Sequence, residues 1–521
     1  MLIFACSGYL AAQSRNAKGP NSHRVVPAAK PAERADIARF RRRIEELLSV
    51  SGPDKGLWGI LVSDAATGEV LYERNADNYF MPASDAKLFT TALALATLGP
   101  DYRVRTTIAA SATLDVNGLL DGDLVLTGRG DANLSNRKFP YEKRAERDGP
   151  ADKVLAELAD AVVARGVKEI SGDVVADDSL FQPERFPDGW AVDDMLWSYG
   201  AAVSAIAVND NAFTLELRPG ALAGDPATYV IDPASDFYAI ENLVRTSPRG
   251  SEERLAVVRD PGSRLVRVSG TMPAGGPPRK LTIAVEEPAE YAANLLARLL
   301  TSRGIQVHGR ARARHAGDPA ASASNRAAEN ILAEHTSLSL AEDIRLTNKN
   351  SENLHAELML LLAAREKSGA TNYEEAEKFA TVFFRTAGIA DGDVVLSDGS
   401  GLSRRDLVTP RAVVQILRYA ATQPWGELYR SSLPVAGEDG TLSERMKNTP
   451  AAGRVFAKTG TIEHVNSLSG YATTAAGAHL IFSLLGNNNR IRAQTADVTL
   501  DAIAAAMVEE LEAAPVGKKR K

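Results

Sequence analysis

The stretch MPASDAKLFTTALALATLGP, residues 81–100, decides the interpretation of this chain because it joins two polar side chains to an otherwise apolar segment. Leucines and alanines run up to Gly99-Pro100, which is typical of a buried helix that ends there. Ser84 and Lys87 are three residues apart in its first turn, so the hydroxyl and the amine share one face. Two interpretations stand at this point. Either Ser84 caps the helix and Lys87 reaches solvent, or the two form a nucleophile and its base.

Length and composition exclude several classes of function. The chain has 521 residues, enough for two or three domains, and its 45% hydrophobic and 24% charged residues are ordinary for a globular protein. A formal net charge of −6 argues against nucleic acid as a partner. The single cysteine, Cys6, excludes intramolecular disulfides and cysteine-based metal sites, and the seven histidines form no metal-binding motif. We therefore expect neither a metal nor another cofactor.

The two ends of the chain are expected to lie outside the fold. Residues 1–35 predict a disordered lead-in or the remnant of an export signal, since their apolar run is far shorter than the ~20 residues of a membrane span. The letters IFAC resemble a bacterial lipobox ending at Cys6, although Phe4 fits that pattern poorly. Residues 513–521 predict a solvated basic tail. No transmembrane span is expected.

The pattern along the chain predicts a mixed α/β fold with a large insertion. An amphipathic helix over 37–50 and a hairpin over 56–75 precede the Ser84 helix. Short β-like runs separated by Gly, Pro and Asp then fill residues 106–330, with helices near 151–166 and 288–304. Helical patterns return from about 335, followed by three strands and a helix over about 492–512. The simplest organisation is one α/β domain, 36–105 plus 331–512, interrupted by a β-rich second domain, 106–330.

Two further triplets fit the partners that S-x-x-K has in serine acyl-transfer enzymes. Ser351-Glu352-Asn353 lies in a helical segment over 340–366, and Lys458-Thr459-Gly460 ends the strand RVFA. Each motif also has a second copy in a polar loop or tail, such as Ser135-x-x-Lys138, so a single match is weak evidence. The three copies on regular elements occur in the order S-x-x-K, S-x-N, K-T-G, and this joint placement favours a site.

The chemistry explains why these residue types belong together. A serine hydroxyl needs a base within hydrogen-bond reach, and Lys87 serves as that base only if its pKa falls through desolvation and a nearby cation such as Lys458. The N–H groups of Ser84 and Thr461 are candidates for an oxyanion site. Ser351 is a candidate proton relay to the leaving amine, and Asn353 is a candidate ligand for a substrate amide.

The substrate's terminal carboxylate is the expected ligand of the K-T-G segment. Lys458 supplies a positive charge, and the hydroxyls of Thr459 and Thr461 flank Gly460 on the strand. Taken one at a time, the threonines could be ordinary strand residues, and Ser351 and Asn353 could form hydrogen bonds within a helix. Taken together, these residues indicate a site.

From about residue 55 to 512 the sequence resembles the class C low-molecular-mass penicillin-binding proteins, the D-alanyl-D-alanine carboxypeptidases/endopeptidases of bacterial peptidoglycan. Beyond the three triplets, the resemblance rests on GDLVLTGRGDANL (122–134), GDVVADDSLF (172–181), VNDNAF (208–213), PRGS (248–251), DGSGLSR (398–404) and LPVAGEDGTL (433–442). It implies a transpeptidase domain of the penicillin-binding-protein/β-lactamase type, with helices around an antiparallel sheet. It also implies a third domain near 212–285, nested in the second.

The resemblance implies an acyl-enzyme at Ser84, release of terminal D-alanine or cleavage of stem-peptide cross-links, inhibition by β-lactams, and a periplasmic or other extracytoplasmic location. An acidic residue of the second domain would hold the diaminoacid of the stem peptide. Asp177 is the first candidate and Asp178 the next, with a turn aspartate as the alternative. A serine β-lactamase and a non-catalytic peptidoglycan- or β-lactam-binding module are the competing functions. The E-x-x-L-N segment of class A β-lactamases is absent from the sequence.

Overall fold

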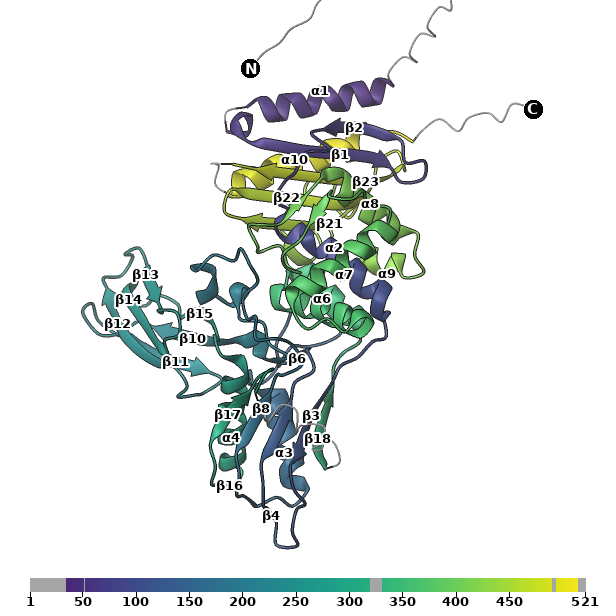
Figure 1. The fold of residues 1–521 in the computed structure, drawn as a ribbon. Coiled ribbons are helices and arrows are strands. Elements are labelled where there is room, and N and C mark those ends of the chain that lie inside the picture. The colour runs from purple at the N-terminus through teal and green to yellow at the C-terminus, as the bar shows by residue number, and fades with distance from the viewer. Residues whose placement is uncertain (1–33, 51, 319–329, 490–492, 514–521) are drawn as a thin grey trace, which may run out of the picture.

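The computed structural model describes residues 34–50, 52–318, 330–489 and 493–513 (Figure 1). The predictions for Cys6, the lead-in and the basic tail therefore fall almost wholly outside the described residues. Within those residues, no helix combines the length and the apolar character needed to cross a membrane.

A five-stranded antiparallel sheet organises the part of the chain that carries the motifs. Its strand order is β2-β1-β23-β22-β21, so the N-terminal hairpin pairs with strands from the far end of the sequence. The strands are β1 (Leu57–Asp64), β2 (Val70–Arg74), β21 (Val455–Ile462), β22 (Val465–Thr473) and β23 (His479–Asn487). The predicted hairpin and the three C-terminal strands are confirmed.

Helices cover both faces of this sheet (Figure 1). α1 (Ala35–Ser49) and α10 (Ala493–Glu510) lie on one face, while α2 (Ala86–Leu98) and α8 (Pro410–Ala421) lie on the other. Side chains alternate along β1, so Ile60 and Val62 join the core beneath α1, and Leu61 joins the core around α2. Because α2 is apolar on every side, it is buried along most of its length and forms the centre of the domain.

The remaining helices of this part surround α2. They are α5 (Leu340–Asn350), α6 (Asn353–Ser368), α7 (Tyr373–Thr386) and α9 (Gly426–Ser432), with a two-stranded ribbon of β19 (Val394–Val395) and β20 (Leu407–Val408). Their apolar side chains pack with those of α2 in one core. The mixed α/β fold predicted from the sequence is confirmed.

The insertion folds around its own sheet, of order β17-β8-β5-β3-β18. Its elements are β3 (Arg105–Ala110), β4 (Leu119–Leu120), β5 (Leu124–Thr127), β6 (Asp131–Leu134), α3 (Lys153–Ala164), β7 (Glu169–Ile170), β8 (Val174–Asp177), β9 (Ile206–Val208), α4 (Pro288–Ser302), β16 (Gln306–Val307), β17 (Ala311–Arg314) and β18 (Ile331–Thr336). Because β18 pairs with β3, the insertion extends through Thr336, and the predicted boundary at residue 330 is one strand too early.

Residues 212–284 hold two small sheets that project to one side of the insertion (Figure 1). One contains β10 (Ala212–Arg218), β11 (Thr228–Asp232) and β15 (Arg279–Ala284), and the other β12 (Ala239–Ser247), β13 (Arg254–Val258) and β14 (Leu265–Pro273). Their inner faces share one apolar core with the insertion sheet. The nested third domain expected near 212–285 stays a prediction, since this segment has sheets of its own but shares its core with the rest of the insertion.

Candidate active site

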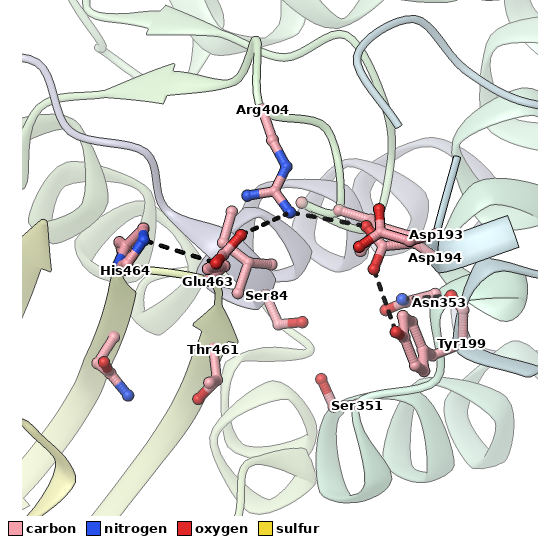
Figure 2. A pocket seen from close by; sticks show the side chains of 14 residues that line it. Ser84, Asp193, Asp194, Tyr199, Ser351, Asn353, Arg404, Thr461, Glu463 and His464 are labelled. Atoms are coloured by element: carbon pink, nitrogen blue, oxygen red, sulfur yellow. Dashed lines mark hydrogen bonds and ion pairs between the residues drawn. The ribbon is translucent and has the colours of Figure 1, made fainter. Parts of the chain in front are cut away.

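Ser84 lies where a short 3₁₀ turn, Ala83–Asp85, leads into α2. Ala83 has a left-handed φ of 48°, so the chain turns sharply just before the serine. Ser84 lines a cleft of about 690 Å³ together with Ser351, Asn353 and Thr461 (Figure 2). The predicted motifs from α2, from the α5–α6 junction and from β21 thus meet at one place.

Lys87 is fully buried beneath this cleft and donates three hydrogen bonds. Its Nζ lies 2.9 Å from Ser84 Oγ, 2.7 Å from Asn353 Oδ1 and 2.7 Å from the carbonyl oxygen of Ser400. Burial lowers the pKa of Lys87 to about 8, although the carboxylates of Asp398 and Glu357 oppose the shift. A lysine in this state is a credible general base near neutral pH.

Ser351 lies between two helices, which differs from the single helical segment predicted over 340–366. α5 ends at Asn350 and α6 begins at Asn353, because Ser351 adopts left-handed angles, φ 64° and ψ 42°. This break points Ser351 into the cleft and places Asn353 at the start of α6. The Asn353 side-chain amide then makes two hydrogen bonds: its Oδ1 accepts from Lys87, and its Nδ2 donates to the carbonyl of Tyr199 at 2.7 Å.

A second serine–lysine pair faces the first. The buried Lys458 donates to Ser351 Oγ at 2.9 Å and to the Thr459 carbonyl at 2.7 Å. Burial and the charge of Lys87 lower the pKa of Lys458. The K-T-G segment lies within β21 rather than at its end as predicted, and the hydroxyl of Thr459 is 2.8 Å from that of Thr441.

Gly460 explains how β21 comes so close to the nucleophile. A Cβ at this position would lie 2.2 Å from Ser467 Oγ, 2.8 Å from the Pro82 carbonyl and 2.9 Å from the Ser84 nitrogen. Only glycine therefore allows the strand to pass beside the turn that carries Ser84. The close approach supports the assignment of the Ser84 and Thr461 N–H groups to an oxyanion site.

Asp85, inside the S-x-x-K motif, is a buried acid that sequence reasoning left without a role. Burial raises its pKa to about 7, while the hydroxyls of Ser469 and Ser467 and the charge of Lys458 act in the opposite direction. A carboxyl group thus lies in the dry region that also holds the two lysines. Its burial could have been suspected from the sequence, because the helix that follows it is mostly apolar.

The outer wall of the cleft carries charges of both signs (Figure 2). The insertion contributes Asp193, Asp194 and Tyr199, whose hydroxyl donates to Asp194 at 3.1 Å. On the opposite side, Arg404 lies 3.9 Å from both Asp194 and Glu463. Sequence reasoning named none of these residues. Arg404 ends the stretch DGSGLSR that carried the family resemblance, whereas the acids follow no periodic pattern.

Asp177, the predicted ligand for the diaminoacid, is not among the residues that line the cleft. It is the last residue of β8 inside the insertion sheet, is 2% exposed, and pairs with Arg314 at 3.3 Å. Asp178 bonds instead to His315 at 2.7 Å and to Ser204 at 2.8 Å. The prediction for Asp177 is therefore wrong in position, because a buried strand directs this carboxylate to a neighbouring strand.

A serine hydroxyl bonded to a buried lysine amine, with a second serine–lysine pair opposite, defines a serine hydrolase of the acyl-transfer type. Comparison with known proteins agrees: the model of the D-Ala-D-Ala carboxypeptidase 3 (S13) family matches residues 41–509. The chain therefore belongs to this family of serine-type peptidases.

Individual relatives support the same assignment. A D-alanyl-D-alanine carboxypeptidase of Actinomadura sp. (strain R39) is 35% identical over 493 residues, which cover 93% of this chain and 87% of the relative. D-alanyl-D-alanine carboxypeptidase DacB of Haemophilus influenzae is 26% identical over 439 residues, which cover 82% of this chain and 85% of the relative. The crystal structure of penicillin binding protein 4 (dacB) from Haemophilus influenzae shares the fold, with a TM-score of 0.73, 24% identity, and coverage of 88% of this chain and 97% of that chain.

Proposed function

We propose that the protein is a D-alanyl-D-alanine carboxypeptidase, with endopeptidase activity on the same bond type, that acts on peptidoglycan stem peptides through an acyl-enzyme on Ser84. The observation that carries the proposal is the 2.9 Å hydrogen bond between Lys87 Nζ and Ser84 Oγ at the floor of an open cleft. Because peptidoglycan lies outside the cytoplasmic membrane, the proposal implies an extracytoplasmic location.

In the acylation step, Ser84 Oγ attacks the carbonyl carbon of the penultimate residue and passes its proton to neutral Lys87 Nζ. The Ser84 and Thr461 N–H groups would stabilise the oxyanion. When the peptide bond breaks, Ser351 Oγ gives its proton to the leaving amine and regains one from Lys458, to which it is already bonded. Water then attacks the ester carbonyl and gives one proton to the Ser351–Lys458 pair, while Lys87 returns its proton to Ser84 Oγ as the ester bond breaks. This releases the shortened peptide and restores both serine–lysine pairs.

The charged wall of the cleft supports a substrate with a zwitterionic end. Asp193 and Asp194 suit an ammonium group, and Arg404 suits a carboxylate, which together match the free end of a stem-peptide diaminoacid. These insertion residues take the role that was expected of Asp177. Thr459 and Lys458 would face the terminal carboxylate from β21.

β-Lactams are expected to acylate the same serine. The H. influenzae penicillin binding protein 4 has been crystallised in complex with a β-lactam, and that structure has a TM-score of 0.69 to this chain at 23% identity. The competing function of β-lactamase requires rapid deacylation. The competing function of a binding module does not require the Ser84–Lys87 and Ser351–Lys458 pairs that the cleft contains.

The test is intact-protein mass spectrometry after incubation with benzylpenicillin, together with D-alanine release from a pentapeptide. Wild type is expected to gain one stable adduct and to release D-alanine, while Ser84→Ala does neither. Ser302→Ala, at an exposed serine that bonds to a carbonyl of its own helix α4, serves as the control and should behave as wild type. Rapid drug consumption without an adduct would favour the β-lactamase, and an intact drug with no released D-alanine would favour the binding module.

A further inference from the structure

The second S-x-x-K copy, in the loop between β6 and α3, contributes a buried arginine that crosses to the catalytic domain. Arg137 Nη2 donates to Glu352 Oε1 at 2.7 Å and to Asp210 Oδ2 at 2.8 Å, and its side chain is only 6% exposed. Burial acts to lower the pKa of Arg137, but the two carboxylates outweigh it and raise the pKa. The arginine is therefore a permanent cation held between the insertion and the S-x-N motif.

Glu352 is the middle residue of that motif, between Ser351 and Asn353. The chain turns from one helix into the next at Ser351, whose left-handed conformation is strained for a residue other than glycine. Such a turn persists only where surrounding contacts hold it. Besides the arginine, the Glu352 carboxylate accepts only a longer contact of 3.4 Å from Asn350 among the described residues.

Asp210 connects the same arginine to a second point on α6. The carboxylate of Asp210 also accepts from Arg147 and lies 3.2 Å from His355 Nε2. The other ring nitrogen of His355 lies 2.6 Å from Asp343 Oδ1 on α5. Burial lowers the pKa of His355, but Asp343 and Asp210 raise it to about 10, so the ring is a cation that joins both helices to the insertion.

The insertion touches the motif a third time at Asn353, whose Nδ2 donates to the carbonyl of Tyr199. The insertion therefore contacts the α5–α6 junction at three side chains, Glu352, Asn353 and His355. Buried charges that are paired and hydrogen-bonded in this way hold a geometry more firmly than apolar contacts, because breaking one leaves an unpaired charge.

We propose that Arg137 and Asp210 of the insertion are positioning residues for the reaction: they hold the Ser351–Asn353 turn so that Ser351 meets Lys458 and Asn353 meets Lys87. The inference rests on the proposed function. It makes the insertion part of the catalytic apparatus as well as a wall of the cleft. The transpeptidase domain alone would then lack a correctly placed proton relay.

The experiment measures the rate of benzylpenicillin acylation by intact mass for the full chain and its variants. Arg137→Met is expected to slow acylation at least tenfold, since a displacement of about 1 Å at a reacting group costs up to 10²-fold. Arg137→Lys should restore part of the rate, because it keeps the charge. Arg144→Met is the matched control: this arginine belongs to the same loop, is 83% exposed and pairs with nearby Glu146, so the rate should not change.

A double-mutant cycle separates positioning from general destabilisation. If Arg137 acts through Ser351, adding Arg137→Met to Ser351→Ala should cause little further loss, whereas independent effects would multiply. Multiplying losses, or a folded Arg137→Met with wild-type acylation, would overturn the proposal. Should Arg137→Met fail to fold, Glu352→Gln tests the same contact with an isosteric side chain, and an unchanged rate there would overturn it too. Failure of the proposed function looks different, since wild type itself would then not be acylated.

Discussion

Lys87 Nζ lies 2.9 Å from Ser84 Oγ, and the lysine side chain has no exposure to solvent. These two facts belong together, because an exposed lysine would stay protonated near pH 7 and could not accept the proton of the serine. The apolar α2 helix is what removes water from the amine. The residues that build the core of the domain therefore also set the basicity at its active site.

Lys87→Met should slow acylation by benzylpenicillin by about 10²- to 10⁴-fold, the usual contribution of a general base. Methionine fills a similar volume without a buried amine, so the melting temperature should stay the same or rise. Intact-mass kinetics and a thermal melt give both readouts. Lys138→Met, in the second S-x-x-K copy, is the control, since that side chain is 56% exposed and pairs with Glu146. A Lys87→Met protein that is acylated at the wild-type rate would contradict the assigned base.

The pH dependence of acylation should follow the same lysine. With its pKa lowered to about 8, Lys87 is mostly protonated at pH 6 and mostly neutral at pH 9. The acylation rate should therefore rise about tenfold per pH unit below 8 and level off above it. The measurement is the second-order rate constant for benzylpenicillin from pH 5.5 to 9.5. A rate that is constant between pH 6 and 8 would show that another group takes the proton.

The sequence could predict the motif residues and most of the elements that carry them because the signals are local. Ser84 and Lys87 are three residues apart on one helix, and β21 to β23 have uninterrupted strand patterns. The break at Ser351 had no such signal, since Ser-Glu-Asn contains neither glycine nor proline and the flanking residues are helical on both sides. That turn depends on partners from distant segments, which no local pattern reports.

The acidic wall of the cleft was missed for a related reason. Asp177 and Asp194 are both acids of the insertion, and only the packing of that insertion against the catalytic domain distinguishes them. The strand β8 directs Asp177 to Arg314, while a short 3₁₀ turn brings Asp194 to the cleft. The sequence therefore indicated that the insertion would bring an acid to the cleft, but it did not indicate which acid.

Gly460→Ala should disturb the site without unfolding the sheet. Its Cβ would collide with the Pro82 carbonyl and the Ser84 nitrogen, so β21 must move away from the nucleophile. We expect acylation to fall about 10²-fold, as for the loss of one oxyanion donor. The control is Gly477→Ala, where a Cβ meets nothing within 4 Å but the φ of +85° is unfavourable. That variant should lose about 1 kcal/mol of stability and keep its acylation rate. Equal acylation by both variants would argue against the close approach.

Asp85→Asn should change the dependence of stability on pH. The folded pKa of about 7 lies above the ordinary value of 3.8, so between these two values the folded state holds a proton that the unfolded state lacks. The free energy of unfolding of the wild type should therefore decrease as pH rises from about 4 to 7. Asparagine does not titrate, so the variant should lack this slope and be more stable than wild type above pH 7. Denaturant unfolding at pH 4.5, 6 and 8 provides the comparison. If the free energies of unfolding of the two proteins changed in parallel with pH, the result would contradict a raised pKa at Asp85.

Arg404→Met should alter which peptide is preferred. The arginine is the cation of the charged wall, 3.9 Å from Asp194 and Glu463, and the proposed partner is the free carboxylate of a diaminoacid. Two pentapeptides make the test, one with a free zwitterionic diaminoacid end and one with that end blocked by amidation and acetylation. For the wild type, kcat/KM should favour the free peptide. For the variant, the loss on the free peptide should exceed the loss on the blocked one by about tenfold, in line with a charged hydrogen bond of about 1.5 kcal/mol. An equal loss on both peptides would mean that Arg404 supports the cleft without contacting this end of the substrate.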